Sequence, residues 1–127
     1  MADSIVAFVP SRDLHKARSF YVDVLGLNFV SEDPFAVVVA SAGIPVRIVN
    51  VSSIEGFRPF PFTILGWDVA DIAVRIGELI KKGVTFQRYD GMTQDELGVW
   101  ASPSGALVAW FTDPDGNVLS LTQHPQR

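Results

Sequence analysis

Few residues in this chain have the chemistry of a catalytic or metal-binding site. The 127 residues include two histidines, His15 and His124, and no cysteine, which excludes a disulfide, a thiolate zinc site and a cysteine nucleophile. His15 falls off the apolar stripe of an expected helix, and His124 follows the last expected strand, so neither is expected to bind a metal. No Ser-His-Asp arrangement, phosphate-binding glycine loop or helical histidine pair is present.

The acidic residues are better explained by turns and loops than by catalysis. Asp113 and Asp115 belong to the sequence DPDG, whose proline and glycine are typical of a hairpin turn. The acidic segment Asp90–Glu96 is expected to be a solvated loop, with a lid or a site for a basic group as the alternative. Tyr89 and Gln94 offer polar contacts from the same loop.

The three tryptophans are the second group of interest. Trp100 and Trp110 lie on neighbouring expected strands, where they would form either a stacking platform for a planar ligand or packing under a helix or at a module interface. Trp67 has the parity of helix-facing residues and is expected in the core.

Two amphipathic helices position these residues, and they belong to a repeat. The first helix begins at the N-cap Asp13 and ends at Gly26, and the second begins at Asp71 and ends at Gly83. The two starts lie 58 residues apart and the two glycines 57 apart. A strand precedes each helix and several strands follow it, so one strand–helix–strands unit occurs twice.

The repeat predicts one domain over residues 1–127, with module one at about 1–51, a linker at about 52–61 and module two at about 62–124. The expected strands of module one are Ile5–Val9, Leu27–Ser31, Phe35–Ala40 and Val46–Val51. Those of module two are Thr63–Val69, Val84–Arg88, Leu97–Ala101, Leu107–Thr112 and Asn117–Thr122.

Composition narrows the class of protein. Hydrophobic residues make up 48% of the chain and charged residues 19%, which is typical of a packed globular protein. The net charge is −4 and no basic cluster is present, so no nucleic-acid partner is expected. No apolar run reaches membrane length and the N-terminus does not read as a signal peptide, which favours a cytoplasmic protein without membrane contact.

Two motifs resemble one known family. The segment DLHKARSFYVDVLGL, from Asp13 to Leu27, resembles the signature of the glyoxalase/bleomycin-resistance/dioxygenase (vicinal oxygen chelate) superfamily, with its acidic cap, central Phe-Tyr and closing Leu-Gly-Leu. The segment WFTDPDGNVLSLTQ, from Trp110 to Gln123, resembles its Asp-Pro-Asp-Gly-Asn hairpin. The resemblance covers nearly all of the chain. It implies an α+β fold of two βαβββ modules, whose curved mixed sheets enclose a cleft, and a homodimer.

The resemblance also identifies where a metal would bind. Metal-dependent members place four ligands, usually His or Glu, on four strands that face the cleft. Counting from the helix caps and the hairpin turn gives Val6, Ile64 and Ser120, and the fourth position falls on Ile48 or Asn50. Because only an asparagine amide among them ligates divalent ions, and weakly, no metal and no other cofactor is expected.

Strand alternation then predicts the lining of the cleft. Arg47 has the opposite parity to Ile48 and is expected to point away from the cleft. The remaining lining is mainly apolar, with a few hydroxyl and amide groups, as in many small-molecule pockets. Its residues are Val6, Phe8, Ile48, Asn50, Phe62, Ile64, Trp100, Trp110, Ser120 and Thr122.

The resemblance favours a metal-independent protein that binds an aromatic or amphipathic small molecule. Three alternatives stay open: a metal-free lyase or isomerase using a polar pair such as Asn50 and Ser120, a metal-dependent glyoxalase or dioxygenase with other ligands, and a structural dimer whose cleft is filled by its own side chains. Binding is preferred to catalysis because no general base of suitable pKa is evident in the cleft. Whether the protein is an enzyme is left open.

Overall fold

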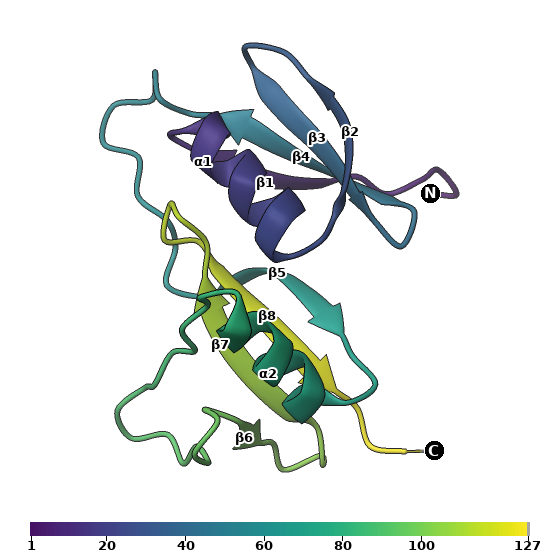
Figure 1. Cartoon of the computed structure of the whole chain (residues 1–127), viewed down its shortest axis with the longest axis vertical. Helices are drawn as coiled ribbons and strands as arrows, with labels where there is room; N and C mark the ends of the chain where they lie inside the picture. Colours follow the sequence, from purple (N-terminus) through teal and green to yellow (C-terminus); the bar gives the residue numbers. More distant parts are fainter. Residues whose placement is uncertain (127) are drawn as a thin grey trace. The chain divides into compact units, whose positions relative to one another are not determined.

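The computed structural model describes residues 1–126, which divide into two compact units (Figure 1). Unit 1 contains residues 1–59 together with the turn 113–117, and unit 2 contains residues 60–112 and the chain from 118 onward. The boundary at residues 59 and 60 falls inside the segment 52–61 expected to be a linker. None of the described helices is long and apolar enough to cross a membrane.

Unit 1 is a four-stranded mixed sheet with one helical segment on one face. Its elements are β1 (Ala7–Ser11), α1 (Leu14–Arg18), the π-helical segment η1 (Ser19–Val24), β2 (Asn28–Glu32), β3 (Ala36–Ser41) and β4 (Ile44–Asn50). The strand order is β1-β4-β3-β2, in which β1 and β4 are parallel and the other neighbours antiparallel.

Unit 2 repeats this topology. Its elements are β5 (Thr63–Asp68), α2 (Ile72–Lys81), β6 (Trp100–Ala101), β7 (Leu107–Thr112) and β8 (Val118–Gln123). The order is β5-β8-β7-β6, with β5 parallel to β8 and the other neighbours antiparallel. The expected α+β fold of two repeated modules with mixed sheets is confirmed.

Both helices begin and end where the sequence predicts. The Asp13 carboxylate accepts a hydrogen bond from Lys16 N over 3.1 Å, and that of Asp71 accepts one from Val74 N over 3.1 Å. Gly26 and Gly83 have φ of +77° and +93°, a region that glycine enters without strain. The caps therefore set the limits of both helical segments.

Three segments differ from the sequence prediction, one of which is the expected strand Leu97–Ala101, shortened to β6 at Trp100–Ala101. The first helix widens after Arg18 into η1, where Leu25 N donates to Phe20 O five residues earlier. The expected strand Val84–Arg88 is a loop with one isolated bridge, between Phe86 and Phe111. Regular strand pairing does not continue past Phe86, because the side-chain amide of Gln94 takes the place of a neighbouring strand. It donates a hydrogen bond to Gln87 O and accepts one from Tyr89 N.

Each unit has its own apolar core, between one face of the sheet and the helix. In unit 1 the buried residues under α1 and η1 include Val9, Val37, Val39, Val46 and Ile48. In unit 2 the buried residues between the sheet and α2 include Ile72, Ile76, Ala109, Phe111, Leu119 and Leu121. We call the other face of each sheet, which its own helix does not cover, the open face.

Candidate functional site

The open face of unit 2 is aromatic. Residues paired across neighbouring strands share a face, so the register places Trp100, Val108 and Thr122 in one row. A second row contains Gly66, Ser120 and Trp110. The ring centroids of Trp100 and Trp110 lie 6.2 Å apart. Four of the expected site residues are therefore brought together by three adjacent strands.

Tyr89 completes the aromatic group, although periodicity gave no signal for it. Its ring meets Trp110 edge-on, with centroids 5.7 Å apart and planes at 82°. Gln94 holds the loop in place, because its amide donates to Gln87 O and Gly98 O and accepts from Tyr89 N over 2.8–3.0 Å. We call Tyr89, Trp100, Val108, Trp110, Ser120 and Thr122 the aromatic face.

Two polar groups modify the aromatic face. Partial burial raises the pKa of Tyr89, which keeps its phenol neutral and able to donate a hydrogen bond. The Ser120 hydroxyl lies over Gly66, where a Cβ would be only 2.7 Å from Ser120 Oγ. Glycine at position 66 therefore leaves the room that this buried hydroxyl occupies.

Phe62 and Ile64 lie outside the regular ladder of unit 2. Thr63 pairs with Val118 and Leu65 with Leu119, so Ile64 is the extra residue of a bulge. Phe62 precedes the strand, is exposed, and has its ring 5.5 Å from that of Phe60. Because of the bulge, the alternation of side chains along β5 does not place Phe62 or Ile64 on the open face.

The open face of unit 1 carries Phe8 and an arginine, and Val6, one residue before β1, has the parity of Phe8. Phe8 pairs with Arg47, and Arg47 pairs with Val38, so these three residues form a row. Ile48 instead pairs with Val9 and is fully buried under the helix, on the opposite face from Phe8. The parity argument that turned Arg47 away from Val6 and Phe8 is thus wrong, because the register of the parallel strands cannot be counted across a variable loop.

Asn50 has a local structural role at the end of β4. It pairs with Ser11, and its Oδ1 accepts a hydrogen bond from Ser52 N over 2.9 Å. Its Nδ2 donates to Pro34 O over 3.4 Å. The amide proposed as half of a polar catalytic pair is therefore engaged by neighbouring loops.

The donor set does not fit a divalent metal. Over residues 1–126 no three His, Asp or Glu side chains gather into a group that could hold an ion. The open-face positions of unit 1 offer Val6 and Arg47, and the corresponding part of unit 2 offers Ser120 beside the bulge residue Ile64. An aliphatic group, a cation and a neutral hydroxyl are not normal ligands for such ions.

Of the two histidines, His124 lies at the end of the aromatic face, because its partner Asp68 pairs with Thr122 in the row of Val108. His15 is an exposed residue of α1. His124 Nε2 is 3.0 Å from Asp68 Oδ1, and both side chains are exposed. The structure thus gives neither histidine a metal or a nucleophile as partner.

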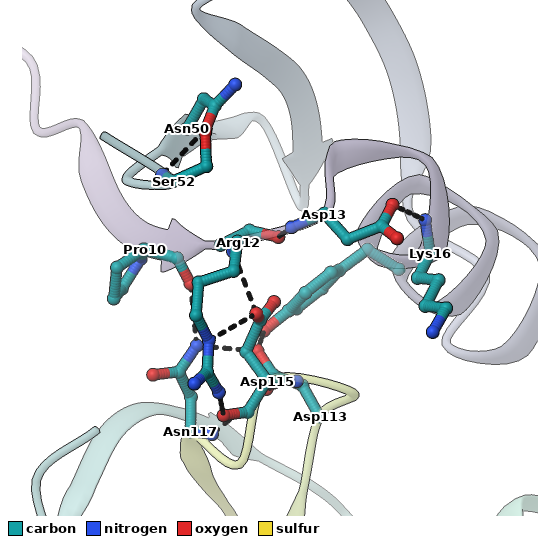
Figure 2. A network of polar contacts seen from close by, with 11 residues as sticks. Pro10, Arg12, Asp13, Lys16, Asn50, Ser52, Asp113, Asp115 and Asn117 are labelled. Atoms are coloured by element: carbon teal, nitrogen blue, oxygen red, sulfur yellow. Dashed lines mark hydrogen bonds and ion pairs between the residues drawn. The ribbon is translucent and has the colours of Figure 1, made fainter. Parts of the chain in front are cut away.

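The carboxylates of the DPDG turn are held in a buried network in unit 1 (Figure 2). Asp113 accepts hydrogen bonds from Tyr21 Oη over 2.7 Å, Asn117 Nδ2 over 2.8 Å, Asp115 N over 2.9 Å and Asn117 N over 3.0 Å. Asp115 accepts from Arg12 N over 2.8 Å, and Asn117 Nδ2 also donates to Pro10 O over 2.8 Å. Both carboxylates therefore have structural partners.

Burial shifts the proton equilibria of this network. It raises the pKa of Asp113, against the opposing effect of the hydrogen bonds from Tyr21 and Asn117. It raises the pKa of Tyr21 far above the usual value for a phenol, and the negative charge of Asp113 adds to that shift. The phenol is thereby held as a neutral donor.

Stability is expected to fall steeply above pH 10 because of Tyr21. The unfolded phenol loses its proton near its ordinary pKa of 10.0, whereas the folded phenol keeps it. The folded state then binds more protons, so stability declines by up to about 1.4 kcal/mol per pH unit. Urea unfolding from pH 9 to 11 should show this slope, which Tyr21→Phe removes. Tyr89→Phe, at a partly exposed phenol, is the control, and an equal effect of both variants would contradict the assignment.

Comparisons with known proteins agree on one family. The family model for the Glyoxalase/Bleomycin resistance protein/Dioxygenase superfamily matches residues 3–121. A superfamily member from Sphaerobacter thermophilus has a similar structure, with 30% identity, 98% of each chain covered and a TM-score of 0.76. No curated protein sequence matches the chain.

Two further structures show the range of functions among similar folds. TnmS3, an antibiotic binding protein from Streptomyces sp. CB03234, is 27% identical, with 98% of this chain and 99% of that chain covered and a TM-score of 0.69. A lactoylglutathione lyase from Agrobacterium tumefaciens is 16% identical, with 97% and 94% covered and a TM-score of 0.72. Because its identity is only 16%, the likeness to the lactoylglutathione lyase shows the fold alone.

Proposed function

Because the chain belongs to the glyoxalase/bleomycin resistance protein/dioxygenase superfamily, we propose that it is a metal-independent binding protein for an aromatic or amphipathic small molecule. The ligand binds on the aromatic face of unit 2. The observation that carries this proposal is the meeting of three aromatic side chains, Tyr89, Trp100 and Trp110, on one open sheet face. Stacking and edge contacts with such rings are favourable for planar ligands.

Polar groups at the aromatic face support the same function. The neutral phenol of Tyr89 and the hydroxyls of Ser120 and Thr122 can orient a ligand, and none of these three groups is a general base at neutral pH. The antibiotic-binding function of a similar Streptomyces protein supports a binding role for this fold. The lack of suitable ligands at the open-face positions supports metal independence.

We also propose a cytoplasmic homodimer. The support for a dimer is the exposed edge strand β2, whose Phe29 and Val30 are solvent-accessible. An unpaired edge with apolar side chains is commonly covered by a partner. The absence of cysteine fits a reducing compartment.

Trp110→Leu is expected to weaken binding of a neutral aromatic probe, phenylnaphthylamine, by about tenfold, because the variant loses the central ring of the aromatic face. Probe fluorescence measured against protein concentration gives the dissociation constant. Adding EDTA should leave that constant unchanged in the wild-type protein.

The matched control is Trp67→Leu, whose ring stacks on Phe111 on the helix-facing side, with centroids 6.4 Å apart. This variant should lower the thermal midpoint and leave the probe affinity intact. A loss of probe affinity in Trp67→Leu but not in Trp110→Leu would place the ligand elsewhere. A loss of probe affinity on adding EDTA to the wild-type protein would refute metal independence.

A further inference from the structure

The geometry points to a binding surface for an anionic group, carried by an aromatic molecule, on the open face of unit 1. The Arg47 guanidinium would bind a carboxylate or sulfonate, and the apolar side chains beside it would contact the aromatic body. This inference deepens the proposed function and rests on it, because Val6 and Phe8 belong to the expected lining of the ligand cleft and Arg47 adds a preference for the charge of the ligand.

The register places Arg47 among apolar side chains. It pairs with Phe8 of β1 on one side and with Val38 of β3 on the other, and directly paired side chains lie about 5 Å apart. Along β4 its same-face neighbours are Pro45 and Val49. Arg47 is therefore the one charged residue on the open face of the described β1, β3 and β4.

The apolar residues around Arg47 are unusually accessible. Phe8 is 59% exposed and Val6 is 45% exposed, whereas the opposite face of the same strand holds Val9 at 1%. Burying such side chains against a ligand is worth about 25 cal/mol per Å² of apolar surface. An aromatic molecule placed over this face thus gains free energy from contact with Phe8 and Val6.

Arg47, like Arg58, has no hydrogen-bond acceptor among the described residues, whereas the four other described arginines have one. Arg12 donates to Asp115, Arg18 to Glu32, Arg75 to Glu78 and Arg88 to the carbonyl of Glu96. Arg47 makes no hydrogen bond or ion pair with any described residue. Its five N–H donors are available to a carboxylate or sulfonate, which a guanidinium can bind through two parallel hydrogen bonds.

The apolar surroundings strengthen this interaction. A ligand that covers Phe8 and Val38 excludes water from the guanidinium, and charges attract more strongly when the surrounding dielectric falls. A cation at this position disfavours a cationic ligand for the same reason. Charge complementarity therefore selects an aromatic anion over its neutral or cationic analogue.

The test compares two fluorescent probes, anilinonaphthalene sulfonate, which is anionic, and the neutral phenylnaphthylamine, on wild-type protein and Arg47→Met. The variant keeps the apolar stem and removes the charge. We expect it to lose about tenfold or more in affinity for the anionic probe, the scale of a hydrogen bond to a charged group, and to bind the neutral probe as the wild type does. Added salt should weaken binding of the sulfonate to the wild type and not to the variant.

Arg75→Met is the matched control, because it makes the same change of net charge on the exposed side of α2. It should leave both affinities unchanged. Arg47→Gln provides a second variant if Arg47→Met fails to reach the wild-type circular dichroism spectrum. An unchanged sulfonate affinity in the folded variants would mean that Arg47 only keeps the face hydrated. Equal loss of both probes, or no sulfonate binding by the wild type, would also overturn the inference, whereas the Trp110→Leu result tests the aromatic face independently.

Discussion

Replacing Asp113 by alanine is expected to lower the free energy of unfolding by about 4 kcal/mol, because it leaves several buried donors without an acceptor. The carboxylate accepts from the Tyr21 phenol, the Asn117 amide and the backbone N–H groups of Asp115 and Asn117. Tyr21 and Asn117 are fully buried, so water cannot replace the lost acceptor. Urea unfolding followed by far-ultraviolet circular dichroism measures the change.

Asp33→Ala is the matched control for this variant. Asp33 is also a turn aspartate that accepts two backbone hydrogen bonds, from Phe35 N and Ala36 N, but it is exposed. Its loss should cost about 1 kcal/mol, since water can hydrate the freed N–H groups. Similar costs for the two substitutions would show that burial of the Asp113 network contributes little to stability.

A glutamate at Ala109 is expected to prevent folding, whereas a glutamate at the adjacent Val108 is expected to fold and to abolish probe binding. Ala109 is fully buried on the side of β7 that faces α2, so a carboxylate there costs about 5 kcal/mol or more. Val108 lies on the aromatic face between Trp100 and Thr122, where the carboxylate can stay hydrated. Circular dichroism and phenylnaphthylamine fluorescence report the two outcomes.

The contrast between Val108 and Ala109 tests the register of β7 directly, because a shift by one residue exchanges the two faces. Val108→Thr controls for the loss of valine itself, since it keeps the shape and adds no charge. If the Ala109→Glu variant folds and the Val108→Glu variant does not, the assignment of the two faces of β7 is reversed. Probe binding that survives in folded Val108→Glu would remove the aromatic face as the site.

The sequence was sufficient for the fold because its strongest signals are local. Asp13 and Asp71 cap their helices through contacts three residues away, and Gly26 and Gly83 end them by a backbone conformation of their own. The repeat of these signals at nearly constant spacing specified two modules. Local capping chemistry does not depend on the rest of the fold, so it can be read without knowing which strands pair.

The candidate site was only partly predictable, because strand pairing is not local. The hairpin of β7 and β8 has a short turn that fixes its register, and the placement of Trp110 opposite Ser120 follows from it. The pairing of β1 with β4 spans more than thirty residues, and alternation within β4 could not tell which of Arg47 and Ile48 shares a face with Phe8. Tyr89 is placed by the side chain of Gln94, for which periodicity offers no signal.

The membership of residues 113–117 in unit 1 has a consequence for the order in which the protein can mature on the ribosome. The partners of Tyr21 and Arg12, Asp113 and Asp115, are synthesised about ninety to one hundred residues after them. At a typical 5–20 residues per second, roughly 5–20 seconds separate these events. During that interval the Tyr21 phenol lacks its native acceptor, so unit 1 completes its hydrogen bonding only after residues 60–112 of unit 2 have been synthesised.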